Sequence, residues 1–171
     1  HGVSFGEPEI DLDALRGWKD KVVGRLTKGL AGLAQQRKVE VLHGTGTFTS
    51  PHTVRIETPD GGSQTVRFSH AIIAAGSEAT QIPVFPNDDE RLIDSTGALT
   101  LADIPARMLV IGGGIIGLEM ATVYAALGTR ITVVELLDGL MPGCDPDLVR
   151  PLLKRIRGRY ENIYLGTKVT A

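Results

Sequence analysis

The sequence predicts an α/β fold whose second half is a parallel sheet built in the order strand, helix, strand, helix, strand. Three observations support this class. Apolar runs of strand length alternate with helix-length segments beyond residue 105, and a glycine cluster separates the first of these strands from the first helix. The chain has 171 residues, of which 42% are hydrophobic and 22% charged, so it can form a core.

Residues 1–80 begin with a predicted amphipathic helix. Apolar residues recur every three or four positions from Leu12 to Leu33, and Asp11 is a suitable N-cap. The opposite face carries charges of both signs, which favours packing against protein over binding to a membrane surface.

The pattern then changes to that of short strands. Alternation predicts strands at 53–57 and 65–68, joined in a hairpin by the turn residues 59–62. A further strand is predicted at 39–42. Residues 71–76 are apolar without polar alternation, as expected of a strand that is covered on both faces.

The segment from Ser77 to Pro105 contains several prolines and an Asn-Asp-Asp run, which predict a linker with irregular structure. We therefore expect a domain boundary near residue 80, which gives domains at 1–80 and 81–171. The second domain should contain strands at 108–111 and 131–135, helices at 116–127 and 146–157, and a last strand from about residue 160.

Residues 112–117 form the pattern G-x-G-x-x-G between a predicted strand and a predicted helix. Gly112 would permit the tight turn, and Gly114 would let a pyrophosphate approach the N–H groups at the positive end of the helix. Gly117 would allow the helix to pack closely against the sheet. In this context the pattern predicts a Rossmann-like dinucleotide site.

An acid follows at the expected place. Glu135 ends the second strand of this domain, where a carboxylate can accept hydrogen bonds from both adenosine ribose hydroxyls and repel a 2′-phosphate. No Arg or Lys occurs from 136 to 148, so NAD is predicted over NADP. Glu119 lies near the helix start, where an acid also favours the helix dipole, so a structural and a functional interpretation are both open.

Other site classes find little support. The net charge is −2, which gives no electrostatic reason to expect nucleic acid or an anionic membrane as partner, and no apolar run is long enough to span a bilayer. The single cysteine, Cys144, excludes an intrachain disulfide and is expected to be a bystander thiol. The four histidines are not spaced as metal ligands, so no metal is expected, and no catalytic constellation is visible.

Residues 108–120 closely resemble the NAD-site segment of the dihydrolipoamide dehydrogenases, which are flavin-dependent pyridine nucleotide–disulfide oxidoreductases. Residues 71–77 resemble that family's A-T-G-S segment, the strand end that approaches FAD. The resemblance covers essentially the whole chain, because further segments follow in the family's order: 29–33, 41–46, 94–96, 135–138 and 167–169.

The resemblance implies a flavoprotein that oxidises protein-bound dihydrolipoamide, passing electrons through a redox disulfide and FAD to NAD. By residue-by-residue comparison, Glu119 would lie near the nicotinamide and the flavin. Ala75 stands where many relatives have Thr, which weakens a side-chain contact to FAD. The implied NAD-binding residues are Gly112, Gly113, Gly114, Ile115, Ile116, Gly117 and Glu135, and those for FAD are Gly46, Ala75, Gly76 and Ser77.

The chain also departs from the family. It lacks the glycine motif for FAD, the C-x-x-x-x-C redox pair, and the interface domain with its catalytic His and Glu, so no catalytic residue is expected in it. We therefore expect an internal segment: residues 1–80 as the C-terminal part of the first segment of a split FAD domain, and 81–171 as an NAD domain incomplete at its C-terminus. Alone, it should be inactive and hold FAD poorly.

For the parent protein the family implies a homodimer, with the lipoyl-bearing transacylase of a 2-oxo acid dehydrogenase complex as partner. Its compartment would be the cytoplasm, or the mitochondrial matrix in a eukaryote. Three alternatives stay open. They are a free-standing NAD-binding module such as a redox sensor, a glutathione or mercuric reductase-like enzyme, and a single-cofactor Rossmann dehydrogenase. The reductases usually use NADP, which Glu135 disfavours.

Overall fold

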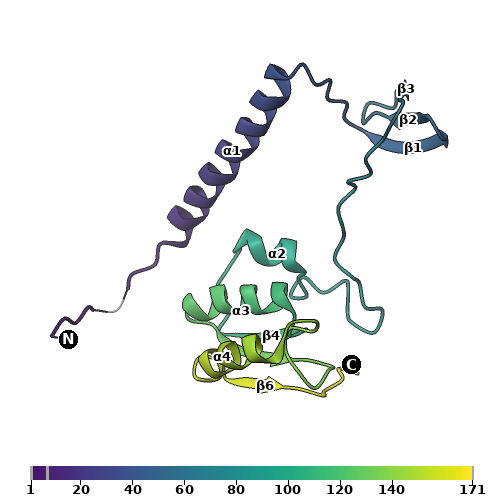
Figure 1. The fold of residues 1–171 in the computed structure, drawn as a ribbon. Coiled ribbons are helices and arrows are strands. Elements are labelled where there is room, and N and C mark those ends of the chain that lie inside the picture. Colours follow the sequence, from purple (N-terminus) through teal and green to yellow (C-terminus); the bar gives the residue numbers. More distant parts are fainter. Residues whose placement is uncertain (1, 7, 171) are drawn as a thin grey trace. The chain divides into compact units, whose positions relative to one another are not determined.

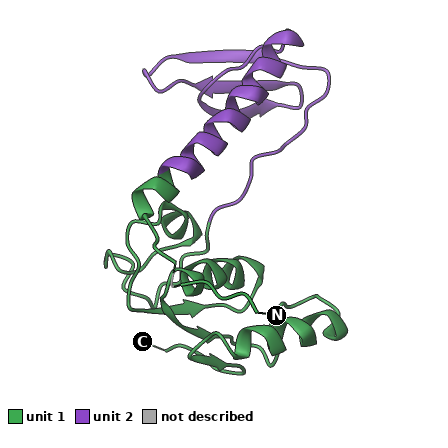
Figure 2. Cartoon of the chain, turned by 90° about the vertical axis from the view of Figure 1, so that its left-hand side faces the viewer, with its two compact units in different colours: residues 1–16, 79–171 green, residues 17–78 purple. Residues whose placement is uncertain are grey.

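A computed structural model describes residues 2–6 and 8–170. The chain forms two compact units, one of residues 1–16 and 79–171 and the other of residues 17–78 (Figure 2). Each unit has its own three-stranded sheet, one made by residues within 45–67 and the other by residues within 107–164 (Figure 1). The domain boundary predicted near residue 80 stays a prediction.

Helix α1 (Leu12–Gln36) begins where the sequence predicts. The carboxylate of Asp11 accepts a hydrogen bond from the Ala14 N–H at 2.9 Å, which caps the first turn. The helix starts in the larger unit, where Leu12 and Leu15 pack against the core. Its continuation in residues 17–36 contains no buried residue, although it carries the predicted apolar positions.

An antiparallel sheet follows, made of β1 (Thr45–Ser50), β2 (Thr53–Glu57) and β3 (Ser63–Arg67) in that order. The hairpin predicted between β2 and β3 is confirmed. Gly44 enters the sheet at φ +156°, and a Cβ there would overlap the Glu57 carbonyl oxygen, so the position requires glycine.

Two predicted strands are wrong. Residues 39–42 are irregular, and the strand nearest to them begins only at Thr45. Residues 71–76 are irregular too, with Ile72 95% exposed and Ile73 74% exposed. A buried strand needs neighbouring strands for its backbone hydrogen bonds, and among the described residues neither segment pairs with one. Apolar composition alone therefore could not make them strands.

The larger unit follows the predicted order from residue 107 onward, with boundaries shifted by one or two residues. Its parallel sheet pairs β4 with β5 and β5 with β6, and helices connect the strands. The last strand is short, which differs from the long strand expected after residue 160. The elements are β4 (Arg107–Ile111), α3 (Ile115–Ala126), β5 (Arg130–Val134), α4 (Pro146–Arg157) and β6 (Asn162–Tyr164).

One helix was not predicted. Helix α2 (Ser95–Thr100) interrupts the segment that proline content assigned to a linker. The carboxylate of Asp94 accepts a hydrogen bond from the Gly97 N–H at 2.8 Å and caps it. The Asp-Ser-Thr run at 94–96 is a helix start signal, but its helix has only six residues, too short for apolar periodicity to show.

The core of the larger unit lies between the sheet and α3. Ile131 and Val133 of β5 are fully buried, and Tyr124 of α3 is 2% exposed and donates a hydrogen bond to the Ala98 carbonyl of α2 at 2.9 Å. This packing fixes the end of β4 and the start of α3 relative to each other. The glycine motif occupies that junction.

Candidate dinucleotide-binding site

The turn from β4 into α3 is made by Gly112. Its φ is +107°, a conformation that L side chains rarely adopt, and its N–H donates to the Val134 carbonyl of β5 at 2.8 Å. The chain can therefore leave the sheet and enter the helix within three residues. This is the tight turn expected of the first glycine in the motif.

Gly117 brings α3 close to the strand that precedes it. A Cβ at this position would overlap the carbonyl oxygen of Gly112 and lie 3.2 Å from Cγ1 of Val110. Because the first of these neighbours is backbone, it cannot give way without moving the turn. The geometry thus explains the third glycine as a close-packing residue.

Gly114 is the N-cap of α3, in an extended conformation, and no side chain among the described residues caps this end. The first N–H groups of an α-helix have no partner within the helix, so they are available to an anion. Ile115 and Ile116 flank them and are 58% and 55% exposed. The start of α3 is thus open to a ligand.

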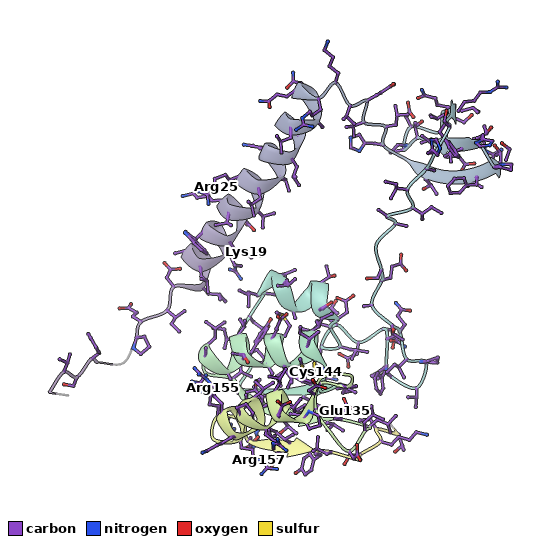
Figure 3. The ribbon with its side chains drawn as sticks, viewed as in Figure 1. Lys19, Arg25, Glu135, Cys144, Arg155 and Arg157 are labelled. Carbon is purple, nitrogen blue, oxygen red and sulfur yellow. The ribbon has the colours of Figure 1, made fainter. Side chains whose placement is uncertain are left out.

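Glu135 lies directly after β5 and reaches the glycine loop (its side chain is labelled in Figure 3). Its Oε2 accepts a hydrogen bond from the Gly113 N–H at 2.6 Å, and its Oε1 accepts one from the Leu137 N–H at 2.8 Å. The residue is only 7% exposed. The structure therefore brings the predicted acid and the predicted glycine loop together, through contacts that the sequence does not reveal.

Leu140 and Met141 are residues of this site that sequence reasoning missed. The Met141 N–H donates to the Gly113 carbonyl at 2.9 Å, and Leu140, 4% exposed, covers Gly113 so closely that a Cβ there would overlap its Cδ2. A Leu-Met pair in a loop carries no binding signal. Only the return of apolar residues directly after the Asp138-Gly139 turn could have suggested burial.

The remaining predicted residues are distributed differently. Glu119 is exposed on α3. Gly46 lies in β1, opposite Ile56 of β2. The predicted flavin contacts at 75–77 are exposed and irregular, with Gly76 at φ +76°. Gly46 and residues 75–77 belong to the unit of residues 17–78. Glu119, the glycine motif and Glu135 belong to the other unit.

Other kinds of site find no support in the part of the chain that the structure describes. No group of three or more His, Cys, Asp or Glu side chains there could hold a metal ion. None of the described helices is both long and apolar enough to cross a bilayer. Cys144 is an exposed free thiol in the loop before α4.

Comparison with known proteins decides the family. The sequence profile of the pyridine nucleotide–disulphide oxidoreductases matches residues 3–171. The chain belongs to this family. The resemblance seen in the sequence is thereby confirmed, and so is the α/β fold class.

Curated relatives carry the names of enzymes. The chain is 50% identical over 171 residues to dihydrolipoyl dehydrogenase of Vibrio cholerae, covering 100% of this chain and 36% of that protein. It is 39% identical over 169 residues to leghemoglobin reductase of Vigna unguiculata, covering 99% of this chain and 32% of that protein. The chain thus spans about a third of the length of these relatives.

Solved structures show the same architecture. The HOCl-induced flavoprotein disulfide reductase RclA of Escherichia coli, in its Cu(II) complex, matches with a TM-score of 0.79 at 27% identity, covering 90% of this chain and 35% of that one. LpdA of Mycobacterium tuberculosis matches in fold, with a TM-score of 0.80 at 19% identity, covering 97% of this chain and 38% of that one.

Proposed function

We propose that this chain contributes the NAD site of an FAD-dependent dihydrolipoamide dehydrogenase. The observation that carries the proposal is the meeting of the Glu135 carboxylate with the glycine loop at the start of α3. The identity of 50% to a dihydrolipoyl dehydrogenase supports the enzyme class.

The residues at this junction fit a dinucleotide. The uncapped N–H groups after Gly114 would bind the pyrophosphate at the positive end of the helix dipole. The carboxylate of Glu135 would accept hydrogen bonds from the adenosine ribose hydroxyls. A 2′-phosphate would instead face a buried negative charge, and no Lys or Arg between 136 and 148 could neutralise it. NAD is therefore the nucleotide that fits.

The flavin side of the proposal rests on family membership. Gly46, Ala75, Gly76 and Ser77 would contact FAD, and Glu119 would lie near the nicotinamide and the flavin ring. Gly76, at φ +76°, can make the turn that this segment requires without strain. Bound FAD would supply the electron transfer between a dithiol and the nicotinamide.

The substrate and partners belong to the proposal for the whole protein. Protein-bound dihydrolipoamide would be oxidised to lipoamide, with a lipoyl-bearing transacylase of a 2-oxo acid dehydrogenase complex as partner and a homodimer as the working form. The protein would work in the cytoplasm of a bacterium or the mitochondrial matrix of a eukaryote. With one cysteine in these 171 residues, the redox disulfide would lie outside them.

The direct test is turnover. A protein that contains this chain together with a C-x-x-x-x-C pair and the interface domain should reduce NAD with dihydrolipoamide and carry bound flavin. The 171-residue chain alone should do neither, since the principal flavin-binding unit and the disulfide are not in it. Lipoamide dehydrogenase turnover by the 171-residue chain, or its lack in the longer protein, would overturn the proposal.

A further inference from the structure

We propose that Glu135 has a second role besides binding ribose. Together with Leu140 and Met141, it holds the glycine loop in its nucleotide-binding geometry before a nucleotide binds. Glu135 is then a positioning residue as well as a ribose ligand. The inference deepens the proposed function and rests on it, because it concerns the same NAD site.

The first support is that the Glu135 carboxylate is hydrogen-bonded within the chain. Both of its oxygens already accept backbone hydrogen bonds, one from Gly113 and one from Leu137. The residue is 7% exposed, and a backbone N–H that loses its partner in a buried place costs free energy. The carboxylate therefore connects the glycine loop to the segment that follows β5.

The second support is that the same loop residue is held from its other side. The Gly113 carbonyl accepts a hydrogen bond from the Met141 N–H at 2.9 Å, while its N–H donates to Glu135. Leu140 covers Gly113 and is 4% exposed. Glu135 and Met141 thus bind both polar groups of Gly113, and together with Leu140 we call these three residues the clamp.

The clamp is itself anchored to the sheet. The Glu135 N–H donates to the Tyr164 carbonyl at 2.8 Å, and the Thr167 N–H donates back to the Glu135 carbonyl at 2.9 Å. The Gly166 N–H donates to the Leu137 carbonyl at 2.7 Å. Glu135 and Leu137 are thus tied to the end of β6 and to the residues directly after it, so the clamp can hold the loop rather than move with it.

This arrangement has a consequence for nucleotide preference. Each carboxylate oxygen has acceptor capacity beyond its present bond, so ribose hydroxyls can be added without breaking the clamp. Replacing Glu135 removes the ribose ligand and also leaves two backbone N–H groups without their acceptor. An Arg at this position should therefore weaken NAD binding without bringing NADP binding up to the level that NAD has in the original protein.

The first experiment uses the ligand-free protein. Amide hydrogen exchange should be measured for the β4–α3 turn in the original protein, in Glu135→Gln and in Asp138→Asn. The Gln side chain has the same size, but either orientation sets its NH₂ against one of the two N–H donors. The control removes an equal charge from an exposed position three residues away.

For Glu135→Gln we expect exchange at Gly113, whose N–H donates to the carboxylate, to become about tenfold faster or more, a factor that corresponds to ~1.4 kcal/mol. Asp138→Asn should leave it unchanged. Exchange that is equal in all three proteins would overturn the inference, whether or not the protein binds NAD. Leu140→Ala, which keeps the carboxylate, should also speed exchange at Gly113, and no change there would contradict the role of Leu140.

The second experiment separates the two tasks of Glu135 with a pair of ligands. ADP carries both ribose hydroxyls, whereas 2′,3′-dideoxy-ADP carries neither. If Glu135 also holds the loop, Glu135→Gln should weaken binding of both ligands. If it binds ribose alone, only ADP binding should weaken, and the inference fails. A protein that binds neither ADP nor NADH contradicts the proposed function instead, and the exchange measurement still tests the clamp.

Discussion

Each of the two units contains a three-stranded sheet, but the units differ in burial. Every buried residue among those described lies between Ala98 and Tyr160, in the larger unit. None of residues 17–78 is buried, and Trp18 and Leu30 of α1 are 66% and 67% exposed. The larger unit therefore carries its own core, whereas residues 17–78 form a helix and a small sheet without one.

The difference teaches that the glycine motif and a buried core can lie together in one unit of a chain while another unit contains no buried residue. A helix is stabilised mainly by packing of its apolar face, and α1 has little packing beyond Leu15. Under the proposed function, residues 17–78 are part of an FAD domain. Their apolar side chains would then pack against the remainder of that domain in the full-length enzyme.

The largest expected effect is on the free energy of unfolding, when one apolar side chain is truncated in each unit. Ile131→Ala removes a fully buried side chain and should lower the free energy of unfolding by about 2–5 kcal/mol. Leu30→Ala removes an exposed one from α1 and should change it by less than about 0.5 kcal/mol. Chemical denaturation of the two variants and the original chain measures both values.

The free energies of unfolding of the same two variants should also be compared in the full-length enzyme. There Leu30→Ala should become costly, because residues 17–78 would be covered, while Ile131→Ala should cost the same as before. A Leu30 effect that is large in the 171-residue chain would mean that this face is already packed.

A smaller effect is expected within the glycine motif. Gly117→Ala sets a methyl group against the Gly112 backbone carbonyl and should lower stability or nucleotide affinity by about 1–3 kcal/mol. Gly113→Ala overlaps a side-chain atom, Cδ2 of Leu140, which can shift further than a backbone carbonyl, so this substitution should cost less. Calorimetric NADH binding and thermal unfolding of both variants test the order, and equal effects would contradict it.

The smallest expected effect concerns pH. In the loop before α2, the Arg91 side chain and backbone N–H donate to the Asp89 carboxylate and lower the pKa of Asp89 from 3.8 to about 2. A depressed carboxylate pKa stabilises the folded state above about pH 3.8, and this contribution is lost as the pH falls toward 2. Asp89→Asn should therefore lower stability slightly at pH 7, where the pairing with Arg91 is present, and make no difference below about pH 2, where the Asp89 carboxyl is protonated.

An NMR titration of the Asp89 side chain checks the assignment. A midpoint near 3.8 in the folded protein would show that the pairing with Arg91 does not persist in solution.

The sequence allowed the larger unit to be predicted well, because its signals are local. Gly112 and Gly117 each answer a constraint set within the short strand–turn–helix segment that contains them, and the backbone geometry at both positions matches that constraint. The strand expected at 71–76 failed for the opposite reason: strand formation depends on a distant partner, which an apolar run does not specify.

The clamp could not be predicted for a related reason. Leu140 contacts Gly113 across 27 positions of sequence, and the contact depends on the path of the loop after β5. Helix α2 was hidden by the prolines around it, although Asp94 marked its start.

The central claim is that the junction of the glycine loop and Glu135 is an NAD site. It is tested most directly by calorimetric titration of the purified protein with NADH and with NADPH under identical conditions. We predict that NADH binds at least about tenfold more tightly, because NADPH would lose charge-assisted hydrogen bonds to Glu135 and place a phosphate beside its carboxylate. Equal affinity for the two nucleotides, or tighter binding of NADPH, would contradict the account.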